Sequence, residues 1–460
     1  MPKYNTCEEL LEKAKTANNH RISYFNINNR SLSKSNKGVI GQIVEEGIFE
    51  YPVNSRSEAD FKDLGVELKV TGIKKLKDKK IACKERLVLN IINYMNEHNI
   101  SFEDSSFWRK NKKLLIMLYL YDNERNDQDF IMLDSFFHEY SDIDLVIIKN
   151  DYKIIQDKIN KGLAHEISEA DTMYLGACTK GADAESNYRT QPYSNLKARQ
   201  RAYCLKQSYM TSVLRSKLSK ERQESIFKIE DIINNTFEIL MESKLKQYYG
   251  KSEKELFKMF NLDKINSKNK YNTLVGRMLG INGNINNSEE FQKANIQLKT
   301  IRVEENNKIK EHMSFPTYKY TEIVKEEWET SEVKSMFEQT KFMFVVFKKK
   351  DGEYYFEKIK FWNMPISILE KEVKEIWQTT VDLIKSGNIV KKVTPSKIYV
   401  NLPGAQVNHI FHTRPHDSQG IRKTGKGYEL PVKDKVTGYI KYTKYCFWLD
   451  KDFILSIINE

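Results

Sequence analysis

The segment GVELKVT at residues 65–71 determines which fold this chain can adopt. Apolar and charged side chains alternate from Val66 to Val70, which is the period of a β-strand with one face on a hydrophobic core. The segment NIQLKTI at residues 295–301 repeats this pattern in the second half of the chain. We therefore expect the same strand to occur twice.

Further pairs of segments accompany these two strands in the same order. Small-residue helix patterns precede them, KGVIGQIVE at 37–45 and NTLVGRMLG at 272–280. The apolar runs KLLIMLYLY at 113–121 and KFMFVVFKK at 341–349 follow, and the copies end with AYCLKQSYMTSVL at 202–214 and YCFWLDKDFILSI at 445–457. Matches in one order indicate a duplicated fold. We place the boundary within residues 223–245 and predict domains at 1–225 and 226–460.

The periodicity of the first copy predicts a mixture of helices and strands. Helices are expected at residues 8–17, 38–49, 151–162 and 195–206, and strands at 66–70, 87–92, 113–121 and 144–149. Such a mixture indicates an α/β or α+β class.

The charge balance of the 460-residue chain favours a polyanionic partner. Lys and Arg number 75 against 63 Asp and Glu, which gives a net charge of +12 at pH 7. No apolar run reaches the ~18 residues that a membrane span needs, so no membrane partner is expected. The five cysteines form no C-x-x-C pair, which argues against a disulfide framework and favours a cytoplasmic location.

Three residues of the first copy form a set that could carry out chemistry. Asp60 precedes Glu67 by seven positions, and Glu67 and Lys69 share one face of the predicted strand. Two carboxylates can hold a hard cation such as Mg²⁺, and a lysine can stabilise developing negative charge or orient a water molecule. The alternative is an exposed Glu-x-Lys pair on a solvated strand, which is common in proteins.

Longer segments resemble a known family. These are K-G-x-x-G-x-x-x-E at 37–45, GVELK at 65–69, KKLK at 74–77, KERLVLNIINY at 84–94, AHEISEADTMYLGACTKGADA at 164–184 and QPYSNLKARQRAYCLKQSYMTSVL at 191–214. Together they resemble the MutH family, which comprises the GATC-specific mismatch-repair nickase and the type II restriction endonucleases of the Sau-three-A kind. The resemblance implies a mixed α/β chain with two tandem MutH-like restriction-endonuclease folds.

The family's catalytic pattern falls on four residues of the first copy. The resemblance implies that Asp60 and Glu67 bind Mg²⁺, that Lys69 acts on the attacking water, and that Glu45 supports the metal site. The spacing between Glu45 and Asp60 departs from the nickase pattern, so Glu46 remains open in place of Glu45.

The second copy lacks this set. Aligned with the first copy, it has Gln297 in place of Glu67, Glu290 in place of Asp60 and Gly280 in place of Glu45. An amide and a missing carboxylate make a poor Mg²⁺ site. We expect a catalytically degenerate domain that binds DNA or acts as an allosteric effector, with a purely structural brace as the alternative.

Basic and aromatic residues are interleaved over residues 186–223, as in phosphate-binding surfaces. The resemblance implies that GATC is read from residues 176–184, with Lys180 as the leading base contact, and it gives Lys37 a phosphate-binding or structural role. The other residues expected to contact DNA are Thr179, Asp183, Arg189, Lys197, Arg199 and Arg201 in the first copy, and Arg414 and His416 in the second.

Three histidines raise the alternative of a zinc site. His409, His412 and His416 have helical spacing, but Pro415 interrupts a helix and no cysteine lies nearby. The segment also aligns with the DNA-facing loop of the first copy. We therefore favour DNA contact over zinc here.

The resemblance implies a type II restriction endonuclease that cuts double-stranded DNA at GATC, 5′ of the guanine, and leaves 5′ overhangs with Mg²⁺ as cofactor. With one intact site per chain and a palindromic target, a double-strand break needs two chains to meet on the DNA or one chain to act twice, and we predict self-association on DNA. The alternatives are a nickase of the mismatch-repair type and a GATC-binding protein without catalysis, such as a regulator.

Overall fold

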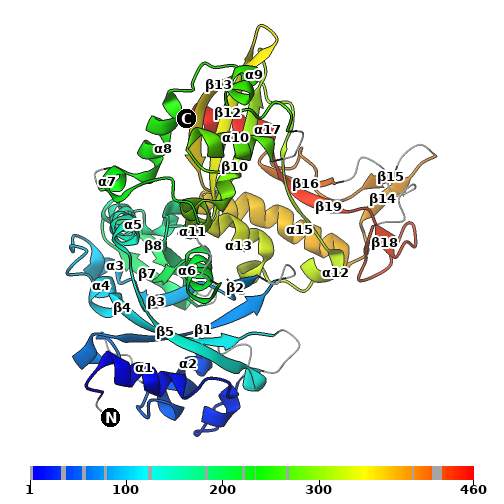
Figure 1. Cartoon of the computed structure of the whole chain (residues 1–460). Coiled ribbons are helices and arrows are strands. Elements are labelled where there is room, and N and C mark those ends of the chain that lie inside the picture. The colour runs from blue at the N-terminus through cyan, green and yellow to red at the C-terminus, as the bar shows by residue number, and fades with distance from the viewer. Residues whose placement is uncertain are drawn as a thin grey trace. The chain divides into compact units, whose positions relative to one another are not determined.

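The computed structural model describes residues 4–32, 38–53, 58–76, 80–122, 127–181, 185–219, 223–233, 235–265, 269–395, 398–416 and 427–460. The chain forms two compact units. Unit 1 comprises Met1–Leu240 and Asn286–Asn295, and unit 2 comprises Met241–Ile285 and Ile296–Glu460. Both units combine helices with small sheets, which confirms the mixed α/β class (Figure 1).

The main sheet of unit 1 carries the strand predicted at residues 66–70. Its order is β2 (Ile81–Cys83), β1 (Glu67–Lys75), β4 (Lys113–Leu120) and β5 (Ile131–Glu139), and only β1 and β4 run parallel. Helices α1 (Cys7–Lys15) and α2 (Val39–Gly47) lie against this sheet (Figure 1). Their apolar faces pack on Leu68 and Leu115, and the core of this layer fixes the start of β1.

A second sheet of unit 1 has the order β3 (Leu87–Ile91), β9 (Arg201–Leu205) and β6 (Leu175–Thr179), and all its pairs are antiparallel. The hairpin of β7 (Tyr188–Gln191) and β8 (Ser194–Arg199) precedes β9. The helices of this part are α3 (Tyr94–Glu97), α4 (Ser106–Asn111), α5 (Asp142–Asn160), α6 (Gln207–Ser219), α7 (Ile229–Ile232) and α11 (Glu289–Ala294).

Unit 2 repeats both sheets. The first has the order β10 (Ile296–Val303), β12 (Lys341–Lys350), β13 (Glu353–Trp362), with β10 and β12 parallel. The second has the order β11 (Met313–Tyr318), β19 (Tyr445–Leu449), β16 (Phe411–Pro415). Hairpins β14 (Val390–Val393)–β15 (Ile398–Val400) and β17 (Tyr428–Glu429)–β18 (Lys441–Tyr442) are added. Its helices include α9 (Glu253–Met259), α10 (Lys270–Met278), α12 (Tyr320–Ile323), α13 (Glu332–Gln339), α14 (Ile366–Ile368), α15 (Lys374–Lys385) and α17 (Lys451–Asn459), while α8 (Phe237–Lys246) spans the unit boundary.

Strand register supports the sequence repeat residue by residue. Leu68 of β1 lies opposite Leu115 of β4, and Leu298 of β10 lies opposite Met343 of β12. The proposed alignment of residues 65–71 with 295–301 and of 113–121 with 341–349 makes the same pairing. Gln297 therefore occupies the strand position of Glu67.

Two predicted elements are wrong. Residues 144–149, expected as a strand, are part of α5, because Ser141 caps that helix and its buried residues follow helical spacing through Ile148, Tyr152 and Ile155. Residues 195–206, expected as a helix, form β8 and β9. Every residue of β9 is buried, so both faces of the strand are covered and the alternation that marks a half-buried strand is absent.

The first stretch of unit 1 ends at Leu240, inside the predicted boundary range of residues 223–245 but after the predicted division at 225/226. Residues 226–240 belong to unit 1, and so does α11, although the repeat assigns α11 to the second copy. Buried polar contacts of α11 with other parts of unit 1 account for this exchange, and they are described below. Among the described residues, no helix is both long and apolar enough to cross a membrane.

Candidate active site

A tight turn brings Asp60 back to the start of β1. The backbone N–H of Phe61 donates to the carbonyl of Val66 at 2.9 Å, and Val66 returns the bond at 3.2 Å. The intervening residues form a short 3₁₀ turn that ends at Gly65. Gly65 has a φ of 63°, a left-handed conformation that costs residues with a Cβ about 1–2 kcal/mol. The glycine of GVELK thus shapes the turn that joins the two carboxylates.

Main-chain N–H groups hold the carboxylates of both Asp60 and Glu67. The N–H of Asp60 donates to Glu67 Oε2 at 3.2 Å, and the N–H of Leu68 donates to Asp60 Oδ2 at 3.0 Å. Glu67 is only 2% exposed. Both carboxylates are therefore held in fixed positions by main-chain donors.

Two lysines face the carboxylate of Glu67. Lys69 Nζ lies 2.6 Å from Glu67 Oε1, and Lys110 Nζ lies 3.5 Å from the same oxygen. The sequence reasoning missed Lys110, which is on α4. The parallel pairing of β1 with β4 could have pointed to it, because Glu67 lies opposite Leu114 and α4 ends just before β4 begins.

The structure separates the two glutamates that the sequence left open. Arg30 holds Glu46, with Nε and Nη2 donating to its two carboxylate oxygens at 2.6 Å each. This contact holds the pKa of Glu46 at about 2. Glu45 has a pKa raised to about 7, by burial first and then by the charge of Asp60, so Glu45 is the one that lies near the carboxylate pair.

Burial and mutual repulsion raise the pKa values of carboxylates in this cluster. Burial and the neighbouring Glu67 raise the pKa of Asp60 to about 6. Burial and the charges of Asp60, Glu45 and Glu67 also raise the pKa of Tyr51, whose buried hydroxyl has no partner among the described residues. Crowded carboxylate oxygens beside an unsatisfied hydroxyl are a donor set that fits a hard, hydrated divalent cation.

The equivalent position of unit 2 has a different character. Gln297 and Lys299 line a cavity of about 320 Å³ together with Phe315 and Trp377. Lys299 Nζ lies 5.6 Å from the ring centre of Phe315, and burial lowers its pKa. Glu326 and Glu332 also line this cavity, but the strand position of Glu67 itself carries the amide of Gln297.

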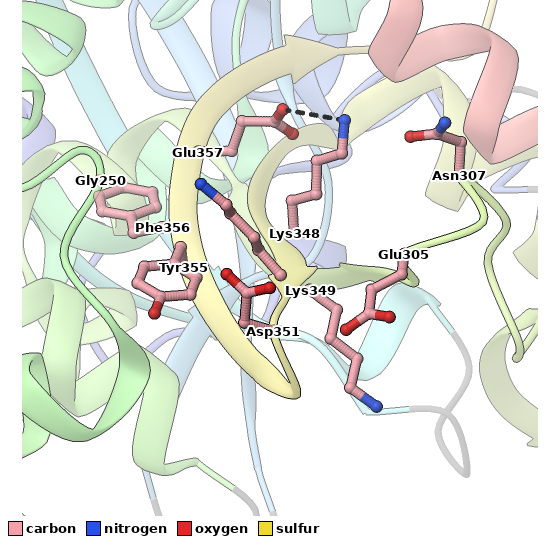
Figure 2. A pocket seen from close by; sticks show the side chains of 10 residues that line it. Gly250, Glu305, Asn307, Lys348, Lys349, Asp351, Tyr355, Phe356 and Glu357 are labelled. Atoms are coloured by element: carbon pink, nitrogen blue, oxygen red, sulfur yellow. Dashed lines mark ion pairs between the residues drawn. The ribbon is translucent and has the colours of Figure 1, made fainter.

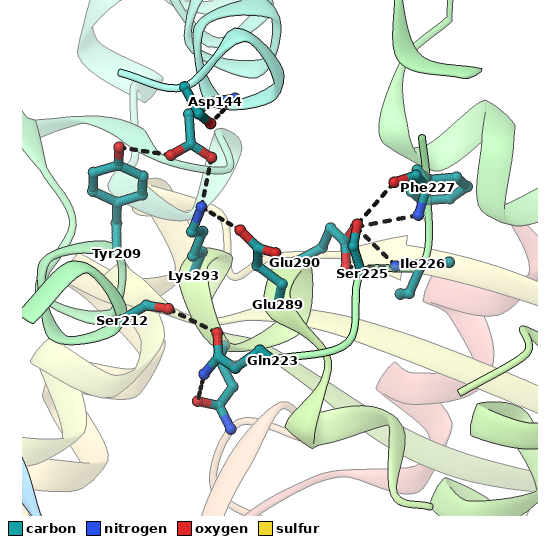
Figure 3. Close-up of polar contacts among 12 residues, drawn as sticks. Asp144, Tyr209, Ser212, Gln223, Ser225, Ile226, Phe227, Glu289, Glu290 and Lys293 are labelled. Atoms are coloured by element: carbon teal, nitrogen blue, oxygen red, sulfur yellow. Dashed lines mark hydrogen bonds and ion pairs between the residues drawn. The ribbon is translucent and has the colours of Figure 1, made fainter. Parts of the chain in front are cut away.

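Glu290, the residue aligned with Asp60, is engaged inside unit 1 (Figure 3). Its Oε1 accepts from the Ser225 hydroxyl at 2.6 Å and from the N–H of Ile226 at 3.0 Å, and the N–H of Phe227 lies 3.3 Å away. Glu290 is 2% exposed. Its carboxylate secures the segment after α6 and is committed to that structural role.

Comparison with known proteins agrees with this two-copy picture. The family model of the DNA mismatch repair enzyme MutH matches residues 49–151 and again 279–376. The type II restriction enzyme Sau3AI of Staphylococcus aureus is 35% identical over 500 aligned residues, which cover the whole of both chains. The chain belongs to the MutH family. This membership confirms the tandem MutH-like folds and makes the chain a nuclease of the restriction-endonuclease class.

In this MutH-family chain, several residues expected to contact DNA surround the end of β6. Thr179 ends that strand, and Lys180 follows it with an exposed side chain while its N–H donates to the carbonyl of Gln200 at 2.9 Å. Arg189 is exposed and donates to the Ser186 carbonyl at 2.6 Å. Lys197 is exposed on β8, and Arg199 at the end of that strand is half-buried.

Arg201 does not lie where the sequence predicted. It is 3% exposed, and its guanidinium donates to the carbonyl of Ala177 at 2.8 Å inside the β3–β9–β6 sheet. Because this side chain supports the sheet, it is removed from the set that faces DNA. The predicted roles of Lys37 and Asp183 concern positions outside the described residues.

Unit 2 presents the corresponding strand end. Arg414 and His416 are exposed at and after the end of β16. The N–H of His416 donates to the carbonyl of Lys444 at 2.8 Å, as Lys180 does to Gln200 in unit 1. His416 and Lys180 are therefore equivalent positions of the two copies.

Unit 2 also has a larger open cavity of about 730 Å³ at the β12–β13 turn (Figure 2). Its charged lining residues are of both signs, and Lys348 lies 3.9 Å from Glu357. This exposed pair is a weak solvated contact. The cavity does not reproduce the buried carboxylate–lysine arrangement of unit 1.

Proposed function

We propose that the chain is a type II restriction endonuclease that hydrolyses both strands of duplex DNA at GATC, 5′ of the guanine, with Mg²⁺ as cofactor. The observation that carries this proposal is the buried arrangement of Asp60, Glu67 and Lys69, in which Glu67 Oε1 lies 2.6 Å from Lys69 Nζ. Membership of the MutH family supports the reaction class.

Asp60 and Glu67 would hold the cation, with Glu45 beside them. A bound Mg²⁺ supplies charge neutralisation at the phosphate and lowers the pKa of coordinated water. Lys69 and Lys110 place two ammonium groups at Glu67, where they can bind the anionic phosphate or orient the attacking water. The N–H groups of Asp60 and Leu68 preorganise the two carboxylates through hydrogen bonds, so these side chains need little rearrangement when DNA binds.

Sequence reading is assigned to the end of β6. Lys180 is proposed to contact guanine in the major groove, since lysine and arginine are the usual donors to the acceptors of that base. Thr179 and Arg189 stand beside it, and Lys197 and Arg199 of the hairpin are proposed to bind the phosphate backbone.

Unit 2 is proposed to bind a second DNA site without cutting it. Exposed Arg414 and His416 occupy the strand end that corresponds to the reading end of unit 1, while Gln297 replaces the catalytic glutamate. With one cutting unit per chain, a double-strand break in a palindrome needs two chains to meet on the DNA or one chain to act twice. We propose that chains self-associate on DNA carrying GATC, and chains that stay monomeric while breaking both strands in one encounter would contradict this.

The proposed compartment is the cytoplasm. The cysteines of the described residues, Cys7, Cys83, Cys178, Cys204 and Cys446, are all free thiols, which suits a reducing environment.

The test is cleavage of a plasmid with Mg²⁺ by the wild type and by Glu67→Gln, followed by sequencing of the ends. Glu67→Gln gives unit 1 the amide that unit 2 already has. We expect linear product cut at GATC from the wild type and a rate lower by more than about a hundredfold in the variant. Nicked product alone would favour a repair nickase. Absence of cleavage together with specific binding to GATC would show a non-catalytic protein.

A further inference from the structure

Three metal-ligating side chains meet in unit 2, and none of them belongs to the carboxylate cluster of unit 1. His312, His412 and Asp450 offer ligand atoms that all lie within 4.8 Å of one another. The rings of His312 and His412 are 4.6 Å apart and nearly perpendicular. His312 Nδ1 lies 3.4 Å from Asp450 Oδ2. In a tetrahedral Zn²⁺ site with bond lengths near 2.1 Å, two ligand atoms are roughly as far apart as His312 Nδ1 and Asp450 Oδ2 are here.

His412 is a buried histidine whose ring nitrogens lack hydrogen bonds among the described residues. It is 0% exposed, and neither Nδ1 nor Nε2 has a hydrogen-bond partner among the described residues. Buried polar groups without partners are rare and costly, so such a group calls for a ligand. His409 and His416, the other members of the histidine series considered from the sequence, are exposed.

Rigid elements hold all three side chains. His412 is on β16, Asp450 directly follows β19, and His312 directly precedes β11, so the three come from adjacent strands of one sheet. Asp450 Oδ1 caps α17 by accepting from Asp452 N–H at 2.8 Å, which leaves Oδ2 toward His312. The N–H of Lys451 donates to His312 Nδ1 at 3.1 Å and is the contact that a cation would displace there.

The corresponding positions of unit 1 are filled differently. In unit 1, Leu205 pairs with Leu87 and Leu175, and in unit 2 Leu449 makes the same pairings with Met313 and Phe411. Superposing these pairings aligns the three ligand positions of unit 2 with residues of unit 1: His312 with Arg86, His412 with Gly176 and Asp450 with Lys206. In unit 1, Arg86 at the position of His312 forms an ion pair with Glu169, at a distance of 2.5 Å. All three positions carry metal-ligating types only in unit 2.

We propose that unit 2 binds one divalent transition ion of the Zn²⁺ class through His312, His412 and Asp450. Imidazole and carboxylate ligands suit this class, and three protein ligands leave a further position for water. The ion ties β11, β19 and β16 together, and its ligand His412 is on the strand whose end carries the exposed Arg414 and His416. This site is separate from the Mg²⁺ site proposed for unit 1.

The test measures Zn²⁺ bound to the metal-free full chain by equilibrium dialysis in excess Mg²⁺, with thermal unfolding in parallel. Cobalt(II) is added separately as a spectroscopic probe. We expect one Zn²⁺ per chain, a raised Tm, and a visible absorption band typical of four-coordinate cobalt. A folded chain that binds no Zn²⁺, or whose Tm is unchanged by it, would overturn the proposal.

Variants assign the ligands. Asp450→Asn keeps a good helix cap and removes the carboxylate charge, so it should remain folded and bind Zn²⁺ at least about tenfold more weakly. His312→Gln should weaken binding similarly. His409→Asn, at an exposed position with a left-handed backbone that asparagine tolerates, should bind as the wild type does. Equal binding by Asp450→Asn, His312→Gln and the wild type, or loss of Zn²⁺ in Glu67→Gln, would contradict this assignment.

Discussion

Lys293 Nζ lies 2.6 Å from Asp144 Oδ1, across 149 positions of the chain, and both side chains are almost fully buried. Tyr209 donates to the other oxygen of Asp144 at 3.0 Å, and Glu289 lies 2.6 Å from the lysine (Figure 3). Through this cluster α11, a helix of the second sequence copy, belongs to unit 1. The helix is therefore part of the folding unit that contains the proposed catalytic site.

Removal of this lysine should destabilise unit 1 strongly. Lys293→Met leaves a buried carboxylate at Asp144 without its cation, which costs about 3–5 kcal/mol in the free energy of unfolding. Asp144→Asn added to Lys293→Met should recover part of the loss, because the uncompensated charge is gone. Urea denaturation of both variants measures this. Lys149→Met, which breaks the exposed pair with Glu103, is the control and should cost less than about 1 kcal/mol.

Substitution of Glu45 should affect cleavage, whereas substitution of Glu46 should affect stability. Glu45→Ala removes a carboxylate beside Asp60, so we expect slower cleavage at saturating DNA and a higher Mg²⁺ requirement. Glu46→Ala releases Arg30 and should lower the Tm while the cleavage rate of the folded enzyme stays close to wild type. Plasmid cleavage over a Mg²⁺ series and thermal unfolding measure the two effects. The reverse pattern would show that Glu46 is the functional residue.

The sequence predicted the duplicated strands and the local catalytic pattern because both depend on short-range features. Alternation around Glu67 and the turn at Gly65 are encoded within a few residues. Lys110 and Tyr51 are not marked by such short-range features, since they reach the carboxylates through tertiary packing of α4 and of the segment after α2, and the pairing of β1 with β4 would be needed to locate Lys110.

Burial explains the remaining errors. The run around Ile148 has the apolar character of a strand, yet it forms one buried face of a helix that continues to Asn160. Arg201 belongs to a basic stretch, and charge alone cannot reveal that its guanidinium supports the Ala177 carbonyl. His412 was considered with its sequence neighbours, while its spatial neighbours are His312 and Asp450.

Restoring a glutamate to unit 2 should not restore cutting. In the Glu67→Gln background, Gln297→Glu returns one carboxylate to β10, but Glu290 remains committed to Ser225 and Ile226 within unit 1. Glu326 and Glu332 line the same cavity as position 297, but the equivalent of Asp60 is still missing, so we expect plasmid cleavage to stay at the level of Glu67→Gln alone. Linear or nicked product from the double variant would mean that unit 2 retains a usable second ligand.

Acidification should destabilise unit 1 through His138. Burial first, and then the positive charges of Lys217 and Lys293, lower the pKa of this ring from 6.5 to about 4 in the folded chain. As the pH falls below 6.5, His138 is protonated in the unfolded chain but stays neutral in the folded chain. The free energy of unfolding therefore decreases between pH 6.5 and about 4. The full effect of this shift is about 3 kcal/mol.

His138→Gln removes that proton linkage and can keep a polar contact with the Tyr209 hydroxyl, which lies 3.3 Å from His138 Nε2. We expect the unfolding free energy of the variant to fall less than that of the wild type across this pH window. Urea denaturation at a series of pH values measures the difference, in which carboxylates common to both proteins cancel. Parallel curves would show that His138 takes up its proton equally in the folded and unfolded chains, against the burial seen here.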